Sequence, residues 1–231
     1  QMFELAKRNQ VPLKYSSVEA LKEAYQFTKR DYLMVLFLGI IGYYFSSLLD
    51  FIGLKYITAS LERLILFAYP TLVVLIGVFY YKEKINRQQI FALFLTYIGI
   101  AIVFIGNVSI TNQTNLIIGS LLIALCAVTY AVYIAVSGAL IPKMGTWIFT
   151  SYVLSVASIA VILHYLIQNK GVGNLDLPMA VYGYGFLMAT FSTVIPTLII
   201  AESIRRIGAS NLAIISSVGP VSTITLAWLF L

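Results

Sequence analysis

Charged residues are scarce in this chain of 231 residues. Aspartate, glutamate, lysine and arginine make up 10% of it, compared with about 25% in soluble domains. Hydrophobic residues make up 60%, and the mean hydropathy is +0.92. A globule of this size could not hide that much apolar surface from water. The composition therefore excludes an ordinary soluble domain and predicts an all-α integral membrane protein, with the lipid bilayer as its surroundings.

Cysteine and histidine are nearly absent, with one residue of each, Cys126 and His164. A lone cysteine cannot form an internal disulfide, and one cysteine with one histidine makes no metal cluster. The spans also lack a mid-depth nucleophile with a base, or paired acids, which an intramembrane protease needs. We therefore predict a protein that is not an enzyme, with no catalytic residues, no metal and no cofactor.

The apolar residues fall into runs long enough to span a membrane, which takes roughly 20 residues per helix. The net charge of +6 lies between these runs, so membrane topology explains it better than a nucleic-acid partner. Before the first run, Ser16 and Glu19 have capping-box spacing and predict a short amphipathic helix over 18–30. The seven predicted spans are 33–54, 60–81, 88–106, 116–141, 147–167, 178–203 and 210–231.

Basic residues are distributed unevenly between the two sets of alternating loops. Cytoplasmic loops of membrane proteins are enriched in lysine and arginine. One set holds only Lys55, Arg63 and Lys170 of the 15 basic residues, and the other twelve lie in the opposite set. This distribution places the N-terminal segment in the cytoplasm and the uncharged loop 107–115 outside.

The sequence contains an internal repeat with an offset of 150 residues. The stretch 54–60, followed by a helix through Pro70, matches 204–210, followed by a helix through Pro220. The two prolines are five crossings apart, and an odd number of crossings inverts one helix relative to the other. Inverted repeats are a transporter architecture because two opposed halves can offer a midplane site to either side in turn. Extending the offset predicts a ten-helix parent, of which this chain would lack two helices in front and one behind.

Prolines and hydroxyl residues gather at mid-depth in these spans. Pro70, Pro196 and Pro220 are expected to kink their helices and free backbone carbonyls. Other hydroxyls at mid-depth are those of Tyr43, Tyr44, Ser46, Ser47, Thr129 and Thr197. A purely structural role, in which hydroxyls join helices, is the alternative for any one residue. As a group they favour a cavity, and the predicted substrate-binding residues are Tyr69, Tyr130, Tyr133, Ser192 and Thr193.

Three charged residues, Asp50, Glu62 and Arg63, lie inside spans within one or two turns of the outer surface. Charges there are costly and are often functional. A proton-coupling carboxylate at Asp50 or Glu62 and an interfacial ion pair with Arg63 both remain open. Glu202 lies near Arg205 and Arg206 at the inner end of its span, where pairing along the helix accounts for it.

Several motifs resemble the EamA family of the drug/metabolite transporter superfamily. The resemblance rests on residues 62–70, 81–85 and 95–101 in the first half, and on 130–138, 182–185, 201–209 and 216–220 in the second. It implies a ten-helix permease of the bacterial inner membrane that exports an amino acid or similar metabolite. The family's usual Gly-Glu after its fourth helix is Lys82-Glu83 here.

The predicted organisation is a cytoplasmic connector, 1–32, the C-terminal part of a first EamA repeat, 33–106, and a truncated second repeat, 116–231. The predicted function is secondary transport of a small metabolite by alternating access, with a homodimer left open. A non-transporting scaffold or sensor is the alternative. A retinal protein is disfavoured because no lysine lies at mid-depth, and a receptor would leave the repeat unexplained.

Overall fold

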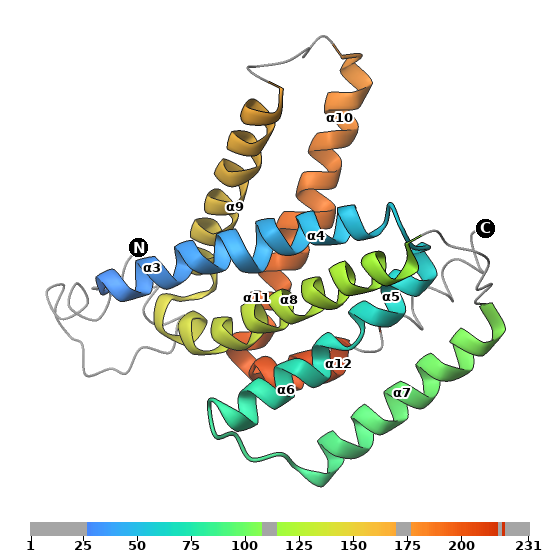
Figure 1. The fold of residues 1–231 in the computed structure, drawn as a ribbon. Coiled ribbons are helices and arrows are strands. Elements are labelled where there is room, and N and C mark those ends of the chain that lie inside the picture. The colour runs from blue at the N-terminus through green and yellow to red at the C-terminus, as the bar shows by residue number, and fades with distance from the viewer. Residues whose placement is uncertain (1–26, 108–114, 170–176, 217–218, 220–231) are drawn as a thin grey trace, which may run out of the picture.

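The computed structural model describes residues 27–107, 115–169, 177–216 and 219, and these form a bundle of helices (Figure 1). Within them, five helices are long and apolar enough to cross a membrane. They are Lys29–Gly53, Leu61–Phe79, Leu116–Met144, Thr146–Gln168 and Met179–Ile207. Five of the seven predicted spans are therefore confirmed, with their ends displaced by a few residues.

The other two predicted spans are described to different extents. The helix α7, Arg87–Asn107, coincides with the predicted span 88–106. The helix α12, Ala209–Ser216, begins the predicted span 210–231, but the rest of that span, including Pro220, lies outside the described residues. Most of the connector also lies outside them. Lys29 and Arg30, assigned to the connector from sequence, form the first turn of the first span, which Thr28 and Asp31 cap.

Two of the spans contain a π-helical segment in the middle. The first consists of α3 (Lys29–Phe37), η1 (Leu38–Phe45) and α4 (Ser46–Gly53). The other consists of α10 (Met179–Leu187), η2 (Met188–Val194) and α11 (Ile195–Ile207). Both ends of α10 are 150 residues after those of α3, and η2 begins 150 residues after η1. The repeat inferred from two prolines therefore extends to the local backbone conformation.

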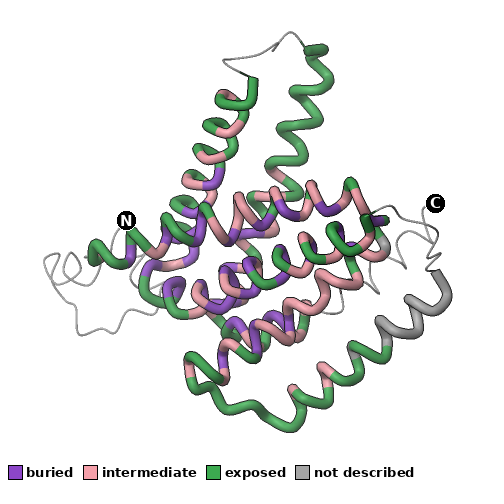
Figure 2. Tube along the Cα trace, in the orientation of Figure 1, coloured by how far each residue is buried: buried purple, intermediate pink, exposed green. Residues whose placement is uncertain are grey.

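Helix α8, Leu116–Met144, occupies the centre of the bundle. It packs against α4 and η1 on one side and against α5 (Ala59–Leu66), α6 (Tyr69–Phe79), α11 and α12 on others. Most of its side chains are consequently buried or half-buried, whereas those of α10 are almost all exposed (Figure 2). Helix α9, Thr146–Gln168, packs on η1 and α11. From its central position, α8 contacts helices of both repeats.

The helices α6 and α12 run in opposite directions, as the inverted repeat requires. A Cβ atom added at Gly77 would lie 2.8 Å from Oγ of Ser210, and one added at Gly219 would lie 3.6 Å from the ring of Phe67. Later residues of α6 therefore meet the start of α12, and residues just before α6 meet the chain beyond α12. Ser210 Oγ also donates to Glu83 at 2.6 Å and joins the two helix ends.

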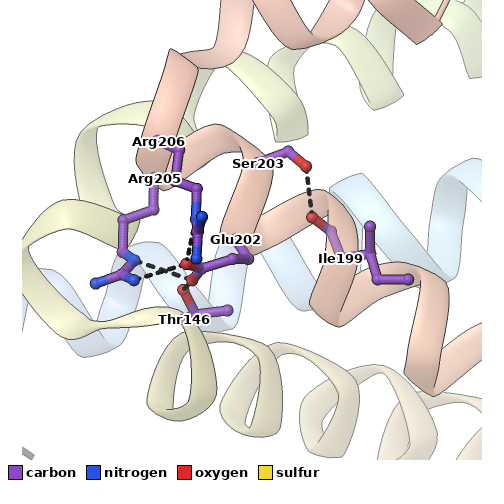
Figure 3. A network of polar contacts seen from close by, with 6 residues as sticks. All are labelled: Thr146, Ile199, Glu202, Ser203, Arg205 and Arg206. Carbon is purple, nitrogen blue, oxygen red and sulfur yellow. Dashed lines mark hydrogen bonds and ion pairs between the residues drawn. The ribbon is translucent and has the colours of Figure 1, made fainter. Parts of the chain in front are cut away.

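Polar contacts gather at one end of the bundle. Figure 3 shows Glu202 of α11 accepting hydrogen bonds from Thr146 of α9 at 2.7 Å, and from Arg205 and Arg206 one turn later. The predicted pairing of Glu202 with both arginines is thereby confirmed. Nearby, Lys143 at the end of α8 pairs with Asp31 at 2.5 Å. The ends of α3, α8, α9 and α11 are thus held together where the larger set of basic residues lies.

Lys82 follows α6 in a left-handed conformation, with φ of 56°. That conformation costs a non-glycine residue about 1–2 kcal/mol. Lys82→Gly is therefore expected to raise the free energy of unfolding by about 1 kcal/mol, measured as an upward shift of the melting temperature in detergent. Lys84→Gly is the matched control, because it removes the same charge where φ is negative and should not stabilise. Equal shifts in the two variants would contradict the assignment of strain to Lys82.

Candidate functional site

A cavity of about 410 Å³ lies between the two π-helical spans, against α8. Its lining comes from η1 and α4 of the first span, from η2 and α11 of the span Met179–Ile207, and from α8. The twelve lining residues are Gly42, Tyr43, Ser46, Ser47, Phe51, Tyr130, Tyr133, Ser192, Thr193, Pro196, Thr197 and Ile200. None of them is charged, and eight carry a hydroxyl group. The volume and the convergence of polar groups are typical of small-molecule sites.

The lining is symmetric under the internal repeat. Each of four first-repeat residues has a lining counterpart 150 positions later. The pairs are Gly42 with Ser192, Tyr43 with Thr193, Ser46 with Pro196, and Ser47 with Thr197. Two thirds of the lining therefore belongs to repeat-related pairs, so matching positions of the two repeats line the same cavity. A site at the interface of the repeats is the arrangement that inverted-repeat transporters use.

The π-helical segments place this lining at mid-span. A π-helix interrupts the regular α-helical hydrogen bonding, and such segments occur frequently at functional sites. Pro196 lies in the first turn of α11, where its missing N–H breaks the pattern further. On the other side, Gly42 lets η1 pass close to α8, because a Cβ there would lie 2.4 Å from Cβ of Tyr133. Local backbone irregularity in both repeats thus opens the space that the cavity fills.

One hydrogen bond crosses the cavity between the repeats. The hydroxyl of Tyr43 lies 3.2 Å from Oγ1 of Thr197, and Thr197 in turn donates to the carbonyl of Thr193 at 2.6 Å. Since a threonine hydroxyl has one proton, Tyr43 is the donor to Thr197. Across the part of the chain that is described, the side chains of Ser47, Ser192 and Thr193 make no hydrogen bond. Their hydroxyls are available to a bound molecule.

A row of tyrosine rings forms the wall of the cavity along α8. Tyr43 packs edge-on against Tyr133 at 6.0 Å between ring centroids, and Tyr133 stacks on Tyr130 at 5.9 Å. Tyr69, at the start of α6, packs edge-on against Tyr130 at 5.1 Å. Aromatic faces and edges attract apolar surface, and the faces also attract cations such as an ammonium group. The wall therefore suits a solute that has an apolar part and an amino group.

Four of the five predicted substrate-binding residues, Tyr130, Tyr133, Ser192 and Thr193, line this one cavity. The fifth, Tyr69, lies behind Tyr130, as its ring contact shows. Their role in binding a substrate remains a prediction. Gly42, Phe51 and Ile200 were missed, because a glycine and two apolar residues carry no chemical signal. The repeat offset could have identified Gly42, because Gly42 lies 150 residues before the predicted site residue Ser192.

Of the three prolines predicted to kink their helices, two lie within the described residues. Pro70 lies in the first turn of α6, directly after a break in the span at residues 67–68. Pro196 follows η2 and lines the cavity. Pro220 lies outside the described residues.

Asp50 and Glu62 lie together near the cavity, but Arg63 does not join them. The two carboxyl groups lie close enough to interact between α4 and α5. Glu62 is buried, whereas Arg63 is exposed and, within the described residues, forms no ion pair with either acid. Nδ1 of His164 lies 2.7 Å from the hydroxyl of Tyr44, and this hydrogen bond joins α9 to the first span.

A multi-pass helical membrane protein with a cavity between two inverted repeats has the architecture of a membrane transporter. The chain belongs to the EamA-like transporter family, whose sequence pattern matches residues 18–105 and again residues 117–231. The resemblance noted from the motifs is thereby confirmed, and the double match agrees with the repeat.

Curated relatives have similar sequences over most of this chain. It is 33% identical over 196 residues to the uncharacterized transporter YcbK of Bacillus subtilis (strain 168), covering 84% of this chain and 62% of YcbK. It is 28% identical over 193 residues to the uncharacterized transporter YyaM of the same organism, covering 83% of this chain and 63% of YyaM. The chain thus spans somewhat less than two thirds of these relatives. A solved crystal structure, 18% identical, superposes with a TM-score of 0.63 over 98% of this chain and 73% of its own, which shows a shared fold.

Proposed function

We propose that the protein is a secondary transporter that moves a small metabolite, an amino acid or a similar solute, through the cavity by alternating access. The observation that carries the proposal is the repeat symmetry of the lining, in which Gly42, Tyr43, Ser46 and Ser47 line the same cavity as their counterparts at 192, 193, 196 and 197. A site shared equally by two inverted halves can be exposed to one side by one half and to the other side by its counterpart.

The lining chemistry supports a zwitterionic or uncharged solute. A net charge would be costly in a cavity without a charged side chain, because no partner would offset its desolvation. Free hydroxyls at Ser47, Ser192 and Thr193 can hydrogen-bond a carboxylate or amine, and the tyrosine wall can take an apolar side chain. Amino acids combine these groups, so the residues predicted from sequence are proposed to contact the solute, with Tyr69 supporting Tyr130.

The proposed setting is the bacterial plasma membrane, with the N-terminal segment and the cluster of Asp31, Lys143 and Glu202 on the cytoplasmic side. The basic residues that gather at that end support this orientation. The proposed direction is export, and residues 33–106 and 116–231 are proposed to belong to the two repeats, joined to a cytoplasmic connector, 1–32. A homodimer would be compatible with the exposed apolar surface of α10.

Solute flux in proteoliposomes tests the proposal. The full-length protein is reconstituted, and uptake of each of a panel of labelled amino acids is compared with that of protein-free vesicles. Uptake of at least one amino acid above the protein-free rate is expected. Absence of flux across a broad panel of metabolites would instead favour the non-transporting scaffold or sensor.

A further inference from the structure

Two carboxyl groups share a buried position beside the cavity. Asp50 at the middle of α4 and Glu62 in the first turn of α5 place their carboxyl groups close enough to interact. Glu62 is only 7% exposed, and Oδ1 of Asp50 is buried and has no hydrogen-bond partner among the described residues. Two ionised carboxylates at such neighbouring, poorly solvated positions repel each other, so a proton on one of them would stabilise the pair.

No cation forms an ion pair with either acid in the part of the chain that is described. Arg63, on α5 itself, acts on Glu62 only through its charge and is exposed to solvent, and Lys55 in the turn between α4 and α5 is also exposed. Helix α8 contributes Cys126, whose Sγ lies 3.3 Å from Oγ of Ser46. A thiol carries no positive charge, so it cannot offset the carboxylates. Helix α7 carries Tyr97, which is hydrogen-bonded to Thr71. A proton, which needs no space of its own, is therefore the ligand that fits this pair of carboxyl groups.

The second repeat shows that the fold does not need acids at these positions. The residues 150 positions after Asp50 and Glu62 are Ile200 and Leu212. Leu212 is a buried member of the apolar core, and Ile200 packs against that core. The same structural positions are thus filled by aliphatic side chains in one repeat and by a carboxyl pair in the other. Packing alone does not account for the pair.

The pair is connected to the cavity through α4. Asp50 lies four residues after Ser46 and three after Ser47, so it shares their helix face one turn away. Phe51, the next residue, lines the cavity, as does Ile200, the repeat counterpart of Asp50. A change in the contact between α4 and α5 would therefore move residues that line the cavity.

We propose that Asp50 and Glu62 form a proton-binding site that couples solute movement to a proton gradient, an inference that rests on the proposed transport function. With one proton bound, the carboxyl and the carboxylate hold α4 against α5. Loss of that proton leaves two carboxylates, which repel and favour separation of the helices. Uptake of a proton restores the contact, so one proton is bound and one is released in each cycle.

Infrared spectroscopy tests proton binding without any transport assay. At pH 7 the full-length protein in lipid is expected to show absorption from a protonated carboxyl group. The band should be lost in the double variant Asp50→Ile with Glu62→Leu, which copies the residues of the second repeat and so keeps apolar packing. Glu83→Gln, at an exposed acid bonded to Ser210, should leave the band intact. If the double variant fails to fold, the single variant Glu62→Gln, of nearly the same shape, replaces it. A wild-type spectrum without a protonated carboxyl, or a band that survives in the variants, would overturn the proposal.

Flux measurements then test coupling. In proteoliposomes, uptake of the transported amino acid by the wild-type protein should depend on an imposed pH gradient, and the double variant should lose that dependence. Wild-type flux that ignores the gradient would overturn coupling and leave transport standing. Absence of flux with every solute would defeat the transport function itself, whereas the infrared result would still decide whether the pair binds a proton.

Discussion

Thr193→Trp is expected to abolish most solute transport without unfolding the protein. Thr193 lies in η2, its side chain is half-buried, and it faces the cavity with a free hydroxyl. An indole ring there would occupy space that the solute needs. Overpacking typically costs about 1–3 kcal/mol. A penalty of that size on solute binding corresponds to a roughly 5- to 150-fold loss of uptake. The measurement is uptake of the transported amino acid by proteoliposomes at equal protein content.

Ile199→Trp is the matched control for this blocking variant. It places the same ring in the same span, at a side chain that is exposed and does not line the cavity. It should transport at close to the wild-type rate. If Thr193→Trp transported as well as Ile199→Trp, the cavity would not be the path of the solute.

The fold could be predicted to a large extent because its signals are local. Apolar runs of membrane length fixed the predicted positions of five spans to within a few residues of those observed. The offset of 150 residues was readable because Pro70 and Pro220 have similar surroundings in the sequence. The two π-helical segments were not predicted, since a π-helix depends on how a span packs and leaves no composition signal.

The candidate site was predicted where its residues carry hydroxyl groups or rings. Tyr130, Tyr133, Ser192 and Thr193 were found because polar groups are conspicuous in apolar spans. Gly42 was missed, since its contribution is the absence of a side chain. The contact of Asp50 with Glu62 also escaped a definite prediction, because it depends on how α4 and α5 turn toward each other. The two alternatives that the charges left open, a proton-coupling carboxylate and an ion pair with Arg63, depend on such tertiary geometry, and the coupling role stays a proposal.

Gly42→Ala is expected to destabilise the protein and to impair transport together. The added Cβ would lie 2.4 Å from Cβ of Tyr133, a distance that real Cβ contacts do not reach. Either η1 or α8 must shift, at a cost of about 1–3 kcal/mol in the free energy of unfolding. Because Tyr133 also lines the cavity, the shift should lower the rate of uptake. Melting temperature in detergent and flux in proteoliposomes are the two readouts.

Gly183→Ala provides the control for this substitution. Gly183 lies inside α10, and a Cβ there would meet nothing within 4 Å in the described structure. Alanine in a helix is about 0.5–1 kcal/mol more favourable than glycine, so this variant should be neutral or slightly stabilised. A Gly42→Ala protein that melts and transports like Gly183→Ala would show that η1 and α8 are not in close contact.

The central claim is that a cavity between two inverted repeats is reached in turn from both sides of the membrane. Thiol labelling tests it in a Cys126→Ser background, with single cysteines introduced at Ser47 and at its cavity neighbour Thr193. Reference cysteines at Asn169 and Lys82, which follow the C-terminal ends of α9 and α6 and are expected on opposite sides of the membrane, should react only from outside and only from inside, respectively. Both cavity cysteines are expected to react with a membrane-impermeant reagent from either side, and the transported solute should protect them. Cavity cysteines that react from one side alone, with and without solute, would contradict the account.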